Sequence, residues 1–116
     1  MTPPQKLNFV LGAIEALKPQ LPGMTGQAHA KPLDRILQEL EVAGFPMSRA
    51  FFRMQVKPAM WDLGIPIAPH KAGMFIVNSS DDLKLAHDWY NQRIAGEIEN
   101  KRKVAYAFCG NRDAEA

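Results

Sequence analysis

The amino-acid sequence predicts a mainly α-helical domain with one small β-hairpin, an α+β fold dominated by helix. The chain has 116 residues, which is the size of one domain with one hydrophobic core. Its hydrophobic content of 47% and charged content of 22% are those of an ordinary globular protein. Apolar residues follow helical spacing along most of the chain, whereas the segment 65–78 contains two short β-prone runs. We therefore expect several helices and a single hairpin that packs against them.

In four segments the apolar residues recur three or four positions apart, as they do along the buried face of a helix. Ser48 precedes the third of these segments, and its hydroxyl can accept a hydrogen bond from an amide of the first helical turn. Pro58 falls inside the same segment, lacks an amide hydrogen and crowds the turn before it. We expect a kink at Pro58, with a division into two short helices near Lys57 as the alternative. The predicted helices span residues 4–18, 31–43, 48–63 and 81–109.

The two β-prone runs predict a hairpin with strands at 65–68 and 74–78, joined by the five residues between them. Two strands alone are marginally stable in water, so the hairpin is expected to lie against helices. Pro66 cannot donate a hydrogen bond to a neighbouring strand, which places the first strand at an edge of the sheet or makes it irregular. The connecting segment is expected to carry His70 and Lys71 at its tip.

The last predicted helix, 81–109, is long relative to the predicted body, residues 1–80. Ser79 and Asp82 have the spacing of a capping box at its start. At about 1.5 Å per residue the helix would be about 40 Å long and would extend beyond the body. Its apolar stripe would then need a partner, most simply a second copy of the chain, while residues 110–116 are expected to form a flexible tail. The candidate dimer contacts are Tyr90, Ile94, Ile98 and Phe108.

The sequence offers few of the residue patterns that enzymes need. It contains no nucleophile elbow, no glycine-rich phosphate loop and no pair of histidines at zinc-ligand spacing. We therefore expect a non-enzymatic protein that has no metal and no cofactor. No run of about 18 apolar residues is present to span a membrane. The single cysteine, Cys109, excludes an internal disulfide and fits a reducing cytoplasm.

Three short motifs follow one another after the third predicted helix. They are Gly64-Ile65-Pro66-Ile67, Gly73-Met74-Phe75-Ile76 and Ser80-Asp81-Asp82-Leu83. Together with the order of three helices, a hairpin and a last helix, these motifs resemble the winged helix-turn-helix domains of small bacteriophage and prophage proteins. The resemblance covers about residues 33–93. It implies that the hairpin is the wing and that the third helix is a recognition helix, which lies in the major groove of DNA.

The resemblance implies DNA contacts from the third helix and from the tip of the wing. The charged residues between positions 49 and 71 are four cations and one carboxylate, although the whole chain has a net charge of only +2. Arginine can pair with guanine, and glutamine with adenine, through two hydrogen bonds each. The candidate DNA-binding residues are Ser48, Arg49, Arg53, Gln55, Lys57, His70 and Lys71. A basic cluster in the last helix supplies candidate phosphate contacts, Lys101, Arg102 and Lys103.

Two functions from different classes remain open. The first is a small protein of a phage or mobile element that binds double-stranded DNA as a transcription regulator or as a replication or packaging accessory. The second is a protein-interaction module, for example an inhibitor of a host complex, that docks a host or phage protein through the winged-helix surface or the last helix. The first function requires the cations of the third helix and the wing to converge, and its binding weakens steeply as salt rises. The second requires an exposed apolar patch, for which the candidates are Phe51, Trp61 and Trp89.

Overall fold

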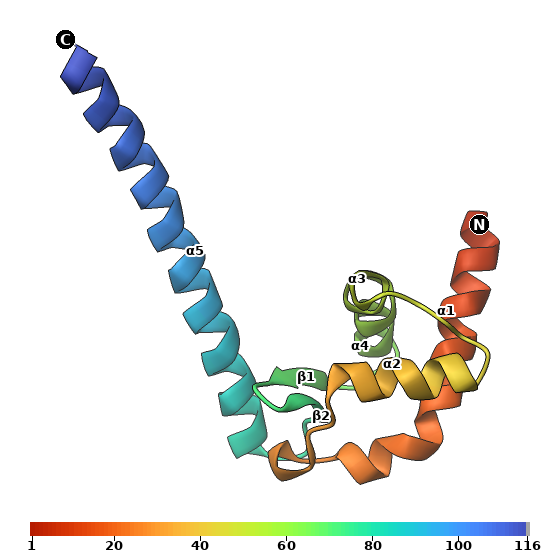
Figure 1. Cartoon of the computed structure of the whole chain (residues 1–116). Helices are drawn as coiled ribbons and strands as arrows, with labels where there is room; N and C mark the ends of the chain where they lie inside the picture. Colours follow the sequence, from red (N-terminus) through yellow and green to blue (C-terminus); the bar gives the residue numbers. More distant parts are fainter. Residues whose placement is uncertain (116) are drawn as a thin grey trace.

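A computed structural model describes the backbone of residues 1–115 and the side chains of residues 1–100, 102–105 and 107. The protein is mainly helical and has one small antiparallel sheet of two strands, as the sequence predicts. The helices and the hairpin form a body, from which the last helix projects (Figure 1). The molecule therefore measures 63 × 39 × 23 Å along its principal axes.

The first helix, α1 (Pro3–Leu17), begins within a residue of its predicted start. Thr2 caps it: its hydroxyl accepts a hydrogen bond from the amide of Gln5, whose side chain accepts one from the amide of Thr2. This reciprocal pair satisfies two amides that a helix start otherwise leaves unpaired. Two 3-10 helices, η1 (Lys18–Met24) and η2 (Gln27–His29), then carry the chain to the sheet.

The second and third helices follow the predicted order. Both agree with their predicted ranges to within two residues at each end. The third helix changes its hydrogen-bonding pattern twice along its length, while the backbone keeps right-handed helical angles at both changes. The elements are α2 (Leu33–Val42), α3 (Arg49–Phe51), the π-helical turn η3 (Phe52–Val56) and α4 (Lys57–Asp62).

A π turn accommodates Pro58 inside the third helix. The amide of Lys57 donates to the carbonyl of Phe52, five residues back, in place of the usual four. This wider turn comes immediately before Pro58, which lies in the first turn of α4 and would crowd the carbonyl of Met54 in a regular helix. The alternative of two separate short helices is therefore wrong, and a π turn stands where we expected a kink.

The hairpin is tighter than the sequence predicts. Its strands are β1 (Ile67–His70) and β2 (Gly73–Ile76). His70 pairs with Gly73, so only Lys71 and Ala72 connect the strands, and the predicted five-residue connection is wrong. Gly73 has a φ of 137°, a value that residues with a side chain rarely adopt, and this lets the chain reverse within two residues. As a consequence His70 is the last residue of β1, and Lys71 alone of the two predicted tip residues lies in the turn.

The segment before α2 covers the second edge of the sheet. Lys31 exchanges two hydrogen bonds with Met74 of β2, with N···O distances of 2.8 Å each. Thr25 forms a bridge to Ile76 of the same strand. β2 is therefore central, and β1 lies at an edge, where Pro69 is tolerated.

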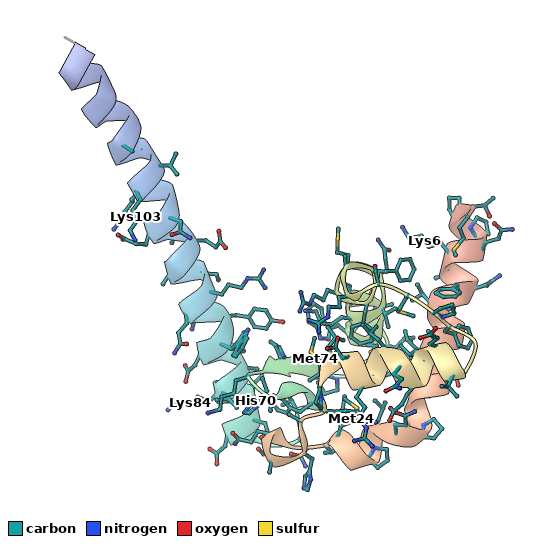
Figure 2. The ribbon with its side chains drawn as sticks, in the orientation of Figure 1. Lys6, Met24, His70, Met74, Lys84 and Lys103 are labelled. Carbon is teal, nitrogen blue, oxygen red and sulfur yellow. The ribbon has the colours of Figure 1, made fainter. Side chains whose placement is uncertain are left out.

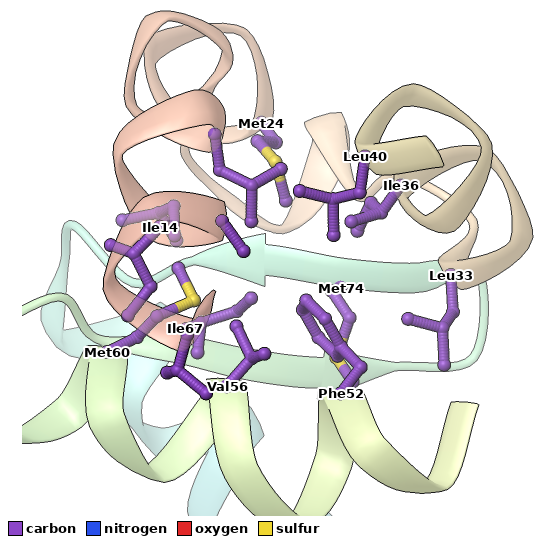
Figure 3. Close-up of a cluster of buried hydrophobic side chains, with 14 residues drawn as sticks. Ile14, Met24, Leu33, Ile36, Leu40, Phe52, Val56, Met60, Ile67 and Met74 are labelled. Atoms are coloured by element: carbon purple, nitrogen blue, oxygen red, sulfur yellow. The ribbon is translucent and has the colours of Figure 1, made fainter. Parts of the chain in front are cut away.

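One hydrophobic core joins α1, α2, the third helix and the hairpin (Figure 3). Phe52 and Val56 of η3 are fully buried and point into the core, whereas Arg53 and Met54 of the same turn are exposed. The core members are Val10, Ala13, Ile14, Leu17, Met24, Leu33, Ile36, Leu40, Phe52, Val56, Met60, Ile67, Met74 and Ile76.

The last helix, α5 (Ser80–Glu115), is anchored at its first turn. The hydroxyl of Ser79 accepts a hydrogen bond from the amide of Asp82, as the capping spacing predicts. The carboxylate of Asp82 does not complete the expected capping box with Ser79. It accepts hydrogen bonds from the amides of Asn78 and Gln27 instead. Asp82 is 3% exposed, so a buried carboxylate joins the start of α5 to η2.

Beyond its first turns α5 leaves the body. Ala86 packs with Phe75 and Ala68 in a second, small apolar cluster. Every described side chain from residue 91 onward is exposed. The helix has 36 residues, about 54 Å at 1.5 Å per residue, and it includes residues 110–115, for which we predicted a tail. The last residue, at position 116, lies outside the described part of the chain.

Candidate functional site

A hollow of about 590 Å³ lies where the third helix, the hairpin and α5 meet. Figure 2 shows His70 and Met74 in this region, on the hairpin beside α5. We call it the basic hollow, because its lining contains three cations and no carboxylate. Its lining residues are Arg53, Lys57, Pro69, His70, Met74, Trp89, Tyr90, Gln92 and Arg93.

Three cations reach the basic hollow from three different elements. Arg53 comes from the π turn η3, Lys57 from the start of α4 and Arg93 from α5. None of the three forms an ion pair with a described residue. Partial burial lowers the pKa of Lys57, and the positive charges of Arg53 and Arg93 lower it further. The site therefore concentrates positive charge without a counterion, which favours an anionic ligand.

Two aromatic side chains of α5 form one wall of the basic hollow. Trp89 and Tyr90 precede Arg93 by four and three residues, so all three lie on one side of the helix. The hydroxyl oxygen of Tyr90 is buried and has no hydrogen-bond partner among the described residues. Burial raises the pKa of Tyr90, and the charge of Arg93 opposes this rise. The wall thus offers an aromatic face and a donor that lacks an acceptor.

The hairpin holds His70 in a defined orientation. Its Nδ1 accepts a hydrogen bond from the amide of Ala72 at 3.0 Å, and its ring meets Phe75 edge-on with centroids 6.0 Å apart. A neutral ring that accepts at Nδ1 carries its proton on Nε2. His70 is therefore a positioned donor at the edge of the hollow.

Two predicted contacts at the start of the third helix have structural partners. The hydroxyl of Ser48 accepts a hydrogen bond from the amide of Phe51 at 3.0 Å, so it caps the helix. Arg49 forms an ion pair with Asp34 of α2, and both side chains are more than half exposed. Such exposed pairs contribute little to stability and are easily exchanged for another anion.

The remaining predicted contacts also lie outside the basic hollow. Gln55 lines a separate hollow between α1 and the third helix. Lys71 is exposed in the hairpin turn. Arg102 and Lys103 are exposed on the projecting part of α5, where Figure 2 shows Lys103, and the side chain of Lys101 lies outside the described residues. Of the seven predicted DNA-binding residues, the hollow thus brings together Arg53, Lys57 and His70.

The predicted dimer contacts divide into two groups. Tyr90 lines the basic hollow, close to the body. Ile94 and Ile98 are 56% and 49% exposed on the projecting part of α5. The side chain of Phe108 lies outside the described residues.

Arg93 and the aromatic wall were not predicted from the sequence as parts of a site. The signal that could have identified them is the spacing of Trp89, Tyr90 and Arg93, which places two rings and a cation on one side of a helix. We interpreted Tyr90 only as a candidate dimer contact and Trp89 only as a candidate residue of a protein-docking patch. Their proximity to Arg53 and Lys57 depends on how α5 leaves the hairpin, which no local pattern specifies.

Two of the three residues that we considered for an apolar docking patch make contacts within the chain. The indole nitrogen of Trp61 donates to the carbonyl of Ile67 at 2.8 Å, and the ammonium group of Lys57 lies 5.4 Å from the centre of its ring. Phe51 is half-buried and packs edge-on against Phe9, with centroids 5.7 Å apart. Both residues therefore help to position the third helix.

Within the described residues no three histidine, cysteine or acidic side chains gather as metal ligands. The described helices also include none that is both long and apolar enough to cross a membrane. No family model, curated protein or solved structure matches this chain.

Proposed function

We propose that this chain is a winged helix-turn-helix protein that binds double-stranded DNA. The order α1, bridging segment, α2, third helix, hairpin supports this assignment of the fold. The pairing of Lys31 with Met74 fixes the hairpin to the segment before α2, so the hairpin is held against the helices as a wing would be. In this proposal the third helix, 49–62, is the recognition helix and β1–β2 is the wing.

The observation that carries the proposal is the basic hollow. Arg53, Lys57 and Arg93 converge beside the third helix and the hairpin without a carboxylate among the lining residues. The DNA backbone supplies the missing anions, because each phosphate carries one negative charge. His70 adds a positioned hydrogen-bond donor for a phosphate oxygen.

The residues around the hollow have different proposed roles. Arg49 and Lys71, both exposed, would extend the contact along the third helix and from the wing turn. Arg49 would exchange Asp34 for a base edge or a phosphate at little cost, since the ion pair is exposed. Ser48 keeps its capping role, and Gln55 does not take part, because it lies in the hollow next to α1.

We propose that α5 joins two copies of the chain. Ile94 and Ile98 lie one helical turn apart, and both are exposed on the projecting part of α5. A dimer would bury them and would present two recognition helices, as two-fold symmetric DNA sites require. The resemblance to small phage proteins suggests a regulator or a replication or packaging accessory.

A salt titration with mixed-sequence duplex DNA tests the proposal. The wild-type protein is expected to bind at about 50 mM salt and to lose affinity steeply by about 200 mM. The double substitution Arg53→Ala/Arg93→Ala removes two phosphate contacts and is expected to reduce the slope of log affinity against log salt by about 2. Lys84→Ala is the control, because Lys84 points away from the body on the outer side of α5 (Figure 2). Absence of duplex binding at low salt in the wild-type protein would refute the proposal.

A second function is favoured by a different surface. Leu7 of α1 and Met54 of the third helix are 57% and 70% exposed, and both line a hollow of about 350 Å³ next to Pro58. Exposed apolar side chains around a groove are typical of protein-docking sites. Binding to a protein partner that Met54→Asp abolishes, with no duplex binding at any salt concentration, would favour this function.

A further inference from the structure

We propose that the basic hollow binds a nucleotide, with its phosphate between the three cations and its base against Trp89. This proposal goes beyond duplex binding, because it requires a single nucleotide unit and not a double helix. The unit can come from a free nucleotide or from a single strand, and the two sources share the same chemistry.

The phosphate position follows from the charges. Arg53, Lys57 and Arg93 come from three elements, line one hollow and have no ion-pair partner among the described residues. Partial burial lowers the pKa of Lys57, and the charges of Arg53 and Arg93 lower it further, so an anion between the three cations would offset their mutual repulsion. Guanidinium groups bind phosphate through two parallel hydrogen bonds, which a single surface lysine cannot provide.

The base position follows from the aromatic wall. Trp89 lines the same hollow and is 38% exposed, so part of its ring is accessible to a ligand. Every base has a flat face that stacks on an aromatic ring, and this contact is independent of sequence. The neighbouring hydroxyl of Tyr90, buried without a partner, is available to donate to a ribose, base or phosphate oxygen.

The size and the lining of the hollow fit the proposed ligand. A volume of about 590 Å³ lies within the range of small-molecule sites, roughly 300–1,000 Å³. Pro69 and Met74 supply apolar surface, and Gln92 adds an amide that can both donate and accept. The larger hollow on α2, about 840 Å³, mixes acidic and basic residues and has no aromatic wall, so it lacks these features.

Calorimetric titration of the full chain tests the proposal with four probes. These are adenosine monophosphate, adenosine, inorganic phosphate and a short single-stranded oligonucleotide. Because phosphate and base are held together, the monophosphate or the oligonucleotide is expected to bind at least about tenfold more tightly than adenosine or phosphate alone. Binding of the monophosphate identifies a free nucleotide as the source. Binding of the oligonucleotide alone identifies a strand.

Matched variants separate the contributions of the aromatic ring, the cation and the tyrosine hydroxyl to nucleotide binding. Trp89→Ala is expected to weaken nucleotide binding about tenfold through the loss of stacking. Arg93→Gln is expected to weaken it to a similar extent, and this exposed change on α5 leaves the core intact. Tyr90→Phe removes only the unpartnered hydroxyl and should reduce affinity by a few fold. Lys84→Ala, which changes the charge by the same amount outside the hollow, should leave the affinity unchanged.

The outcomes distinguish this proposal from duplex binding. If neither the monophosphate nor the oligonucleotide binds more tightly than inorganic phosphate, the nucleotide site is refuted, whatever the duplex result. If nucleotide binding survives Trp89→Ala and Arg93→Gln together, the site lies elsewhere and the proposal is also refuted. If nucleotide binds and the duplex does not, the nucleotide site stands and the proposed function fails.

Discussion

The body of the protein and the projecting part of α5, residues 94–115, represent two ways in which a helix can occur in a small chain. In the body, α1, α2 and the third helix each bury an apolar face in one core. In the projecting part, every described side chain is exposed, including Ile94 and Ile98. Most helical stability in proteins comes from the packing of an amphipathic face. The projecting part therefore lacks, in a single copy of the chain, the interactions that stabilise the body.

The functional residues lie at the boundary between these two regions. Arg53 and Lys57 belong to the body, whereas Arg93 is on the first turns of α5 that leave it. Asp82 and Ala86 fix the direction in which α5 departs, and this direction brings Arg93 to the basic hollow. The comparison thus predicts different consequences for substitutions in the body, at the boundary and on the projecting part.

The largest expected effect comes from the core residue Phe75. It is fully buried in β2, and Phe75→Ala is expected to lower the free energy of unfolding by about 3–5 kcal/mol, through lost burial and a residual cavity. Ile98→Ala, at a 49% exposed position, is the matched control and should change it by less than about 0.5 kcal/mol at low protein concentration. Urea denaturation measures the free energy of unfolding of both variants. A large effect of Ile98→Ala that grows with protein concentration would indicate that the projecting part is packed in an oligomer.

The second largest effect is expected at Gly73. A Cβ atom there would lie 1.9 Å from the carbonyl oxygen of Lys31, and its φ of 137° is strained for any other residue. Gly73→Ala should therefore break the pairing of Lys31 with Met74 and cost about 3 kcal/mol. Gly23→Ala is the control, because no atom lies within 4 Å of its added Cβ. Equal thermal midpoints for the two variants would contradict the close approach at Gly73.

The fold of the body could be predicted from sequence to the extent that it depends on local patterns. Helical spacing and capping residues specified the helices, since Ser48 does cap the third helix and Ser79 does cap α5. The π turn at Pro58 could not be predicted, because it depends on Phe52 and Val56 remaining in the core while the proline is accommodated. Proline alone would favour two separate helices, whereas packing of Phe52 and Val56 in the core favours one helix with a π turn.

The candidate site was less predictable, because it depends on contacts between distant segments. Arg53, Lys57 and His70 are close in sequence and were identified as candidates. Arg93 reaches them because two contacts fix the direction of α5: Asp82 binds the amide of Gln27, 55 residues away in sequence, and Ala86 packs against the hairpin. A capping pattern indicates that a helix starts at Ser79 but not in which direction it runs.

A third, intermediate effect is expected at Asp82, which joins the two regions. Asp82→Ala removes the acceptor for two amide groups and is expected to destabilise the protein by about 1–3 kcal/mol. Because the direction of α5 depends on this contact, nucleotide and duplex binding should weaken even where the protein remains folded. Asp81→Ala, an exposed position one residue earlier, is the control and should have little effect on either property. Binding that is unchanged in folded Asp82→Ala would show that Ala86 alone orients α5.

The smallest effect, and one of opposite sign, is expected at Gly96 on the projecting part. No atom lies within 4 Å of a Cβ added at this position, so Gly96→Ala introduces no clash. Alanine favours a helix interior over glycine by about 1 kcal/mol, and far-ultraviolet circular dichroism should therefore show a gain in helix content. The fluorescence of Trp61 and Trp89 reports on the body, and its urea midpoint should stay unchanged if the projecting part unfolds independently. A midpoint raised by the full 1 kcal/mol would contradict that independence, and would mean that α5 and the body unfold as one cooperative unit.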